Sequence, residues 1–152
     1  MDRKHRNVIV TWIDGEEVEY QRPVNGRSGG GVSMSLVAVY GTLRENGSNH
    51  NIIKMGKSEL KGAATIFGFD MFDTGMGFPA CVDGAGIIIC EVYEVDADTE
   101  KCLDVLEGVP HHYIKEKIAT PFGEAFIYLY PERSHLKNQI VYGDWMKYTK
   151  EK

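Results

Sequence analysis

The 152-residue sequence predicts one α+β domain, richer in strands than in helices, with a β-hairpin appended at its N-terminus. Strand and helix patterns alternate along the chain from about residue 35. The segment "RPVNGRSGGGVS" precedes that point and has the Gly, Ser and Arg content of a linker. A composition of 43% hydrophobic and 26% charged residues is that of a globular chain with a core of its own. We therefore expect a hairpin and linker over residues 1–34 and the main domain over 35–152.

The N-terminal segment "VIVTWIDGEEVEY", residues 8–20, has the pattern of a β-hairpin. Asp14-Gly15 is a preferred two-residue turn, because both positions adopt a positive φ there. This turn pairs Ile9 with Tyr20 and puts both on one face of the hairpin.

The elements of the main domain follow from apolar periodicity and from turn residues. The strand over 36–40 precedes a short helix that Gly56 ends. The run "AGIIICEVYEVD" is apolar enough for burial on both faces of a strand. A turn at 120–123 joins two alternating strands, and we expect a helix in the tail over 138–152. The expected strands are 36–40, 63–72, 85–96, 113–120 and 124–130, and the expected helices are 49–55, 97–107 and the tail.

The first candidate functional feature is the turn "YGTL" at the end of the 36–40 strand. Gly41 allows a sharp turn and the close approach of a ligand, because it has no Cβ. Successive backbone N–H groups that leave a strand can bind a carboxylate or a phosphate. A plain turn is the alternative, and the segment matches neither a P-loop nor a dinucleotide-binding motif.

The second candidate is Glu107, in the last turn of the helix over 97–107. Asp96 or Asp98 can cap the start of this helix, and Gly108 followed by Pro110 ends it. A carboxylate is disfavoured at the C-terminal end of a helix dipole. At about 100° per residue, Glu107 lies only about 40° from Leu103, on the border of the apolar face that also contains Cys102 and Leu106. Burial and the dipole would both raise the pKa of Glu107, as a general base near neutral pH requires; an exposed, ion-paired glutamate is the alternative.

Composition also narrows the classes of partner. No apolar run approaches the roughly 20 residues that span a bilayer, and no secretory signal is evident. A net charge of −5 with scattered Lys and Arg argues against nucleic acid. Three cysteines without a CxxC pair indicate reduced, buried thiols in a cytoplasmic protein, not disulfides or a zinc site. The adjacent His111 and His112 would point to opposite faces of a strand, so we expect no metal site.

Several segments, in order, resemble motifs of the γ-glutamylcyclotransferase-like family, in particular its compact bacterial and phage-type members. Tyr40-Gly41-Thr42-Leu43 resembles the family's Tyr-Gly-(Ser/Thr)-Leu loop. Leu103 to Gly108 resembles the Leu-Asp-x-x-Glu-Gly helix end that carries the catalytic glutamate. The other matching segments are Cys90 to Val95 (with Cys90 in place of the usual glycine), Gly77 to Ala80, and Gly143 to Trp145.

The resemblance, which covers about residues 36–145, implies a small mixed β-barrel flanked by short helices. It implies release of 5-oxoproline from a γ-glutamyl substrate, without cofactor or metal. Tyr40, Gly41, Thr42 and Leu43 would hold the substrate's α-carboxylate, and Glu107 would take a proton from its α-ammonium. Tyr113 matches a tyrosine that follows the family's helix. Lys115 occupies the place of a basic residue that is common in the family.

Two choices stay open from the sequence. Phe126, Tyr128 and Tyr130 share one face of a strand, and Tyr128 is our candidate for a pocket residue, with core packing as the alternative. Arg44 either contacts an anionic substrate or forms a surface salt bridge. The expected partner is a small γ-glutamyl molecule, with no nucleic acid and no membrane. A binding domain without turnover, or an interaction protein that uses the edge of the hairpin, would be the other readings.

Overall fold

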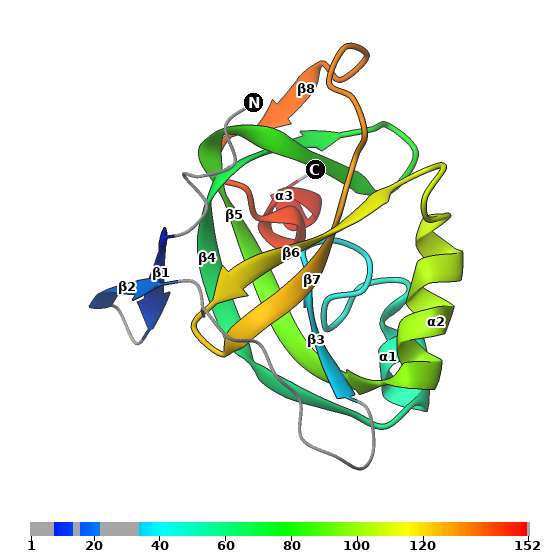
Figure 1. The fold of residues 1–152 in the computed structure, drawn as a ribbon. Helices are drawn as coiled ribbons and strands as arrows, with labels where there is room; N and C mark the ends of the chain where they lie inside the picture. Colours follow the sequence, from blue (N-terminus) through cyan, green and yellow to red (C-terminus); the bar gives the residue numbers. More distant parts are fainter. Residues whose placement is uncertain (1–7, 14–15, 22–33, 152) are drawn as a thin grey trace.

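The computed structural model describes residues 8–13, 16–21 and 34–151, and of the first two ranges it describes the backbone. Its body is a mixed sheet that curls into a half-barrel with three short helices (Figure 1). The α+β class and the barrel-like sheet flanked by short helices are therefore confirmed. The helices are α1 (His50–Met55), α2 (Ala97–Glu107) and α3 (Trp145–Glu151).

The half-barrel has six strands in the order β6-β7-β3-β5-β4-β8. Neighbouring strands are antiparallel, except that β3 and β7 run parallel. Register shifts after Leu60 and Phe67 mark irregularities in β4, and such bulges help a long strand to bend. The strands are β3 (Met34–Val39), β4 (Ser58–Asp73), β5 (Pro79–Asp96), β6 (Ile114–Thr120), β7 (Gly123–Leu129) and β8 (Asn138–Ile140).

Two apolar clusters cover the two faces of the sheet. Alternate residues of β3 divide between the two clusters. Val37 and Val39 belong to the cluster that contains Leu103 of α2, whereas Ala38, and Tyr40 just after the strand, belong to the cluster that contains Trp145 of α3. This is the period-two alternation of a strand that is covered on both sides. It places α1 and α2 on one face of β3 and α3 on the other.

The hairpin forms as predicted, with β1 (Val8–Ile13) and β2 (Glu16–Gln21) antiparallel and Ile9 opposite Tyr20. The predicted Asp14-Gly15 turn and the linker over 22–33 lie outside the described residues. The division into a 1–34 segment and a 35–152 domain stays a prediction.

The helical prediction for the tail is wrong in its first part. Residues 138–140 form β8 at the edge of the sheet, paired with Met71 to Asp73 of β4, and the helix begins only at Trp145. Pairing with β4 is a long-range contact that local periodicity does not reveal. The expectation of full burial for β5 holds in part: Ile88 is buried, and Ile87 and Ile89 are half-buried.

No helix in the described part of the chain has the length and the hydrophobicity that crossing a membrane would require.

Candidate active site

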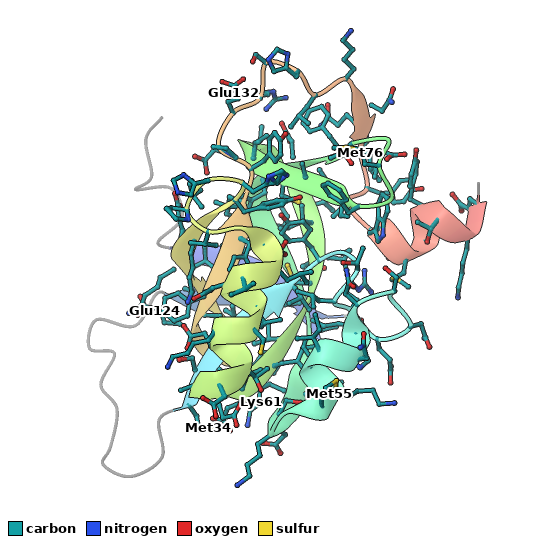
Figure 2. All side chains as sticks on the ribbon, turned by 90° about the vertical axis from the view of Figure 1, so that its right-hand side faces the viewer. Met34, Met55, Lys61, Met76, Glu124 and Glu132 are labelled. Carbon is teal, nitrogen blue, oxygen red and sulfur yellow. The ribbon has the colours of Figure 1, made fainter. Side chains whose placement is uncertain are left out.

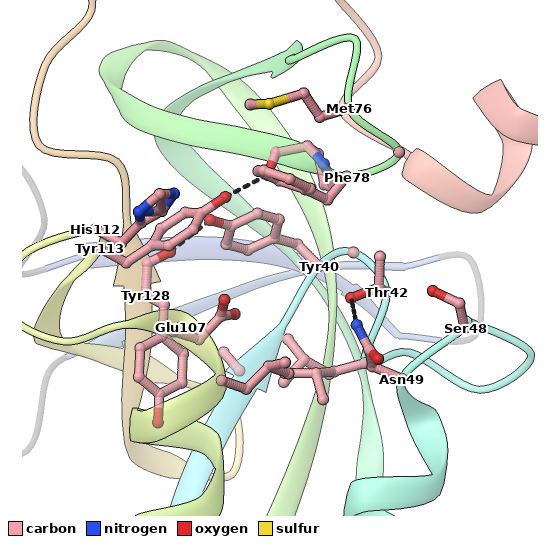
Figure 3. Close-up of a pocket in the computed structure, with 17 residues that line it drawn as sticks. Tyr40, Thr42, Ser48, Asn49, Met76, Phe78, Glu107, His112, Tyr113 and Tyr128 are labelled. Atoms are coloured by element: carbon pink, nitrogen blue, oxygen red, sulfur yellow. Dashed lines mark hydrogen bonds between the residues drawn. The ribbon is translucent and has the colours of Figure 1, made fainter.

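The end of β3, the loop after β4 and the end of α2 enclose a cavity of about 330 Å³ (Figure 3). All the residues predicted for the site line this cavity, although they come from distant parts of the chain. They are Tyr40, Gly41, Thr42, Leu43, Glu107, Tyr113 and Tyr128. The fold thus brings the loop after β3 and the glutamate of α2 to one place.

Gly41 is required at the end of β3 because Pro79 packs against it. A Cβ on Gly41 would lie 2.7 Å from both Cγ and Cδ of the Pro79 ring, closer than such contacts occur. Pro79 is the first residue of β5, and its carbonyl accepts a hydrogen bond from Tyr113 Oη at 3.0 Å. The glycine therefore allows the loop to lie against the segment that also orients Tyr113.

The loop after Gly41 is held by its own hydrogen bonds. The Arg44 N–H donates to the Gly41 carbonyl at 3.0 Å, and the Asn49 N–H donates to the Thr42 carbonyl at 2.8 Å. Asn49 Nδ2 also donates to Thr42 Oγ1 at 3.0 Å. Within the described chain, no acceptor is found for the backbone N–H groups of Thr42 and Leu43. Because Thr42 and Leu43 line the cavity, their N–H groups are candidates to donate to a bound anion.

Arg44 belongs to this loop, but its side chain is ion-paired and does not line the cavity. Its Nε lies 3.0 Å from Glu91 Oε2, and its Nη1 lies 3.0 Å from Asp144 Oδ1. The Arg44 side chain is only 11% exposed, so these pairs are better shielded than surface salt bridges. Glu91 also accepts from the Glu45 N–H at 2.7 Å and from Tyr93 Oη at 2.8 Å. This network connects the loop after β3 with β5 and with the start of α3.

Helix α2 presents Glu107 to the cavity from its last turn. Asp96 caps the start by accepting from the Thr99 N–H, and Gly108 ends the helix with a φ of +64°. Thr99 and Leu103 are the buried residues of α2, and Glu107 follows at the same four-residue interval. The prediction that Glu107 borders the buried face is confirmed.

The composition of that face was predicted incorrectly in part. Cys102 and Leu106 are exposed, and so the buried stripe runs through Thr99 and Leu103. Because only one side of α2 contacts the sheet, the apolar character of these two residues did not determine which side that is. Of the three thiols, Cys81 and Cys90 are buried as predicted, and Cys102 is not.

Burial raises the pKa of Glu107 from 4.5 to about 7. The cause is the loss of water around the carboxylate, which disfavours its charged form. The negative end of the α2 dipole acts in the same direction. Figure 3 shows the carboxylate directed into the cavity, toward Tyr40. Glu107 can therefore exchange a proton near neutral pH with a group bound in the cavity.

Three tyrosines surround Glu107, and burial is the main cause of the raised pKa of each. The charge of Glu107 acts in the same direction on all three, and for Tyr128 the hydrogen bond to Asp104 contributes more than Glu107 does. The Tyr40 hydroxyl donates to the Tyr128 carbonyl, and the Tyr113 hydroxyl donates to Pro79. Tyr128 Oη donates to Asp104 Oδ1 at 2.7 Å and points away from the cavity (Figure 3). Tyr128 therefore lines the cavity, but its hydroxyl does not face it. The hydroxyl instead connects β7 to α2 through the hydrogen bond to Asp104.

Lys115 of β6 forms ion pairs with the same helix. Its Nζ lies 3.0 Å from Asp104 Oδ1 and also pairs with Glu100. Both acids belong to α2, so Lys115 and Tyr128 together fix the position of the helix that carries Glu107. Lys115 does not line the cavity.

The described residues contain no cluster of His, Cys, Asp and Glu that could hold a metal ion. His112 lines the cavity beside Tyr113, with the ring centroids 6.1 Å apart. Sequence reasoning considered His112 only as a metal ligand and missed its place at the site.

Other cavity residues were missed as well. Ser48 and Asn49 follow the loop after β3, and Met76 to Phe78 form the turn between β4 and β5. The motif Gly77 to Ala80 was a signal for this turn, but the sequence alone gave it no role. Met76 lies in the upper part of the molecule in Figure 2, and α1 with Met55 lies in the lower part.

The cavity at the end of β3 therefore brings together the Tyr40–Leu43 loop and a glutamate whose pKa burial raises. Comparisons with known proteins point to one family. A family model described as "Gamma-glutamyl cyclotransferase, AIG2-like" matches residues 37–147. A putative γ-glutamylcyclotransferase of Vibrio cholerae is 41% identical over 72% of this chain and 94% of its own length.

Solved structures show the same fold. An uncharacterized protein from Pyrococcus horikoshii superimposes with a TM-score of 0.68 at 29% identity, over 77% of this chain and 94% of that one. Protein ytfP from Escherichia coli gives a TM-score of 0.61 at 32% identity, over 75% and 98% of the two chains. A relative from Niallia circulans, 33% identical over 65% of this chain and 57% of its own, is named a γ-L-glutamyl-butirosin B γ-glutamyl cyclotransferase.

The chain belongs to the γ-glutamyl cyclotransferase, AIG2-like family, and it is a γ-glutamylcyclotransferase-like enzyme. The resemblance of the Tyr40–Leu43 loop and of the Glu107 helix end led to the correct family.

Proposed function

We propose that the protein converts a γ-glutamyl amide or γ-glutamylamine into 5-oxoproline and a free amine, with Glu107 as the base. The observation that carries this proposal is the position of Glu107, a carboxyl group of pKa about 7, in the cavity that the Tyr40–Leu43 loop also lines. The name of the Niallia circulans relative, which specifies a γ-glutamyl substrate, is consistent with this class of reaction.

The substrate's α-carboxylate binds to the backbone N–H groups of Thr42 and Leu43. This placement directs the α-ammonium toward Glu107 and the tyrosines around it. The Tyr113 hydroxyl donates its hydrogen bond to the Pro79 carbonyl, so the hydroxyl oxygen can accept a hydrogen bond from the ammonium. Tyr113 therefore favours the orientation in which the α-nitrogen faces the base.

Glu107 takes one proton from the α-ammonium, and the resulting amine attacks the γ-carbonyl carbon of the same substrate. The new C–N bond closes a five-membered ring. The bond to the leaving nitrogen then breaks as Glu107 returns its proton to that nitrogen. The ring nitrogen loses its second proton through the same carboxylate, and the amine departs as an ammonium ion. No atom is gained or lost, since 5-oxoproline and the amine together have the composition of the substrate.

The reaction suits a site with one proton-transfer group. Nucleophile and electrophile belong to one molecule, so correct orientation supplies a high effective molarity. A carboxyl group whose pKa lies near the working pH can act first as a base and then as an acid. The burial of Glu107 provides that pKa.

The test is the release of 5-oxoproline from a panel of γ-glutamyl amino acids and γ-glutamylamines. Wild type and Glu107→Gln are assayed together, and Glu132→Gln, which changes an exposed residue after β7, is the matched control (Figure 2). Release by wild type and by the control, with loss in Glu107→Gln, supports the proposal. A folded wild type that releases no 5-oxoproline from any compound contradicts it.

A further inference from the structure

The cavity that contains Glu107 has a buried inner wall and an exposed, apolar rim. The inner wall consists of residues that are at most 7% exposed: Tyr40, Leu43, Tyr113 and Tyr128. The rim is formed by Met76 and Leu106, which line the same cavity and are 65% and 39% exposed. A ligand that extends from the inner wall to this rim would cover apolar surface that otherwise faces water, and such burial favours binding.

The turn between β4 and β5 presents Met76 at the rim. Gly75 and Gly77 flank Met76 with φ angles of +84° and +92°, which glycine adopts without strain. Thr74 Oγ1 accepts from the Met76 N–H at 3.2 Å and donates to the Phe78 carbonyl at 2.7 Å. In the view of Figure 3, Met76 and Phe78 lie above Glu107. The backbone of the turn is thus held by hydrogen bonds, while the unbranched Met76 side chain can adapt to ligands of different shape.

The cavity offers little to a charged leaving group. Among the described residues that line it, Glu107 is the one carboxylate and none is Lys or Arg. His112 also lines it and carries a positive charge only when protonated. Leu106 and Glu107 belong to the last turn of α2, which has no basic residue and forms the negative end of the helix dipole. A leaving group that ends in a carboxylate would meet this negative end, and any charge would lose water against the apolar rim.

We propose that the rim is the subsite for the leaving group and that it selects an uncharged, apolar amine, such as an alkylamine. The inference rests on the proposed function, since it names the class of amine that this reaction releases. The N–H groups of Thr42 and Leu43 and the carboxylate of Glu107 hold the glutamyl part against the inner wall. The leaving group then extends toward the opening, between Met76 and Leu106.

The rim takes no part in the chemistry. Glu107 gives its proton to the nitrogen that leaves the γ-carbonyl, and the alkyl chain beyond that nitrogen is unchanged by the reaction. The rim contacts the chain equally in the bound substrate and in the transition state. A longer apolar chain should therefore raise kcat/KM by lowering KM, with little change in kcat.

Two uncharged substrates test the apolar contact on the full chain: γ-glutamyl-ethylamine and γ-glutamyl-pentylamine. Full burial of one methylene strengthens binding by about 4-fold, and about 2-fold is expected at a partly exposed rim. The pentyl chain has three more methylenes than the ethyl chain. We therefore expect kcat/KM to favour the pentylamine derivative by roughly 8-fold or more, mainly through KM.

Two charged substrates of the same length test the selection against charge. The γ-glutamyl derivatives of 5-aminopentanoate and 1,4-diaminobutane match the pentylamine derivative in length, but they end in a carboxylate and in an ammonium. Both should have a lower kcat/KM than the pentylamine derivative, because the apolar rim does not replace the water around either charge.

A double variant tests whether Met76 and Leu106 form the subsite. Met76→Ser with Leu106→Ser should lower the pentylamine-to-ethylamine ratio of kcat/KM at least 3-fold. The matched control is Met55→Ser with Leu60→Ser, which removes an exposed methionine and an exposed leucine that do not line the cavity, and it should retain the ratio. Because both substrates are measured on the same sample, the ratio does not depend on how much of a variant is folded.

Equal kcat/KM for the ethylamine and pentylamine derivatives in wild type would overturn the inference and leave the proposed function intact. So would faster turnover of either charged derivative than of the pentylamine derivative, or a ratio that the double variant at the rim retains. No 5-oxoproline from any γ-glutamyl compound would instead overturn the proposed function itself, and the inference with it.

Discussion

Replacing Glu107 with Gln should stabilise the protein at alkaline pH and change its stability little at acidic pH. The folded-state pKa of about 7 exceeds the ordinary value of 4.5 by about 2.5 pH units. One unit corresponds to about 1.4 kcal/mol, so ionisation of the buried carboxylate costs the folded state about 3 kcal/mol.

The direction follows from proton binding. Below pH 4.5, Glu107 is protonated in both states, and its burial carries no charge penalty. Between 4.5 and about 7 the folded state keeps a proton that the unfolded state has lost, so the free energy of unfolding falls as pH rises. Above about 7 the group is ionised in both states and the full penalty is present. Gln does not titrate and has no such penalty.

The assay is urea unfolding of wild type, Glu107→Gln and the control Glu132→Gln at about pH 5 and about pH 8. The stability of Glu107→Gln relative to wild type should increase by about 2.5 kcal/mol between the two conditions. Glu132 is exposed, so its variant should follow wild type. A pH-independent difference, or a wild type that gains on Glu107→Gln as pH rises, would refute the assignment of a raised pKa to Glu107.

Three further predictions concern the parts that surround the site. Gly41→Ala places a Cβ against the Pro79 ring, so it should lower the free energy of unfolding by about 1–3 kcal/mol and reduce 5-oxoproline release. Unchanged stability in urea would contradict the packing argument. Tyr128→Phe removes the hydroxyl that donates to Asp104 and should cost about 1–2 kcal/mol in urea unfolding, with a lower kcat/KM; a variant equal to wild type in both would show that this bond does not position α2. Deleting residues 1–34 should leave 5-oxoproline release and the oligomeric state unchanged, as chromatography and the enzyme assay can check; a loss of either would favour a role for the hairpin and reject the predicted domain boundary.

Local signals in the sequence determined the elements that carry the candidate site. The capping residues of α2 and its helical phase placed Glu107 next to the buried face, because both depend only on nearby residues. The strand that ends at Tyr40 was recognised from its apolar run. Periodicity did not predict that these two segments meet in one cavity. That prediction came from the ordered set of family motifs.

The remaining features depend on contacts between distant residues. The packing of the Pro79 ring explains why position 41 requires glycine, and no local sequence pattern connects the two positions. Cys102 was assigned to the buried face because it is apolar, yet the orientation of α2 is fixed by Lys115 and Tyr128, which hold Asp104. The strand β8 likewise forms only through its pairing with β4, which is distant in the sequence.

The most direct test of the central claim is the pH dependence of kcat/KM for 5-oxoproline release by wild type, with Glu107→Gln assayed beside it. We expect the wild-type rate to rise with pH to a plateau, with a midpoint near the Glu107 pKa of about 7, because the free enzyme must hold the carboxylate ionised. The variant, folded and at least as stable as wild type, should lose roughly 100-fold or more of the rate. A variant that keeps the wild-type rate would contradict the assignment of Glu107 as the base.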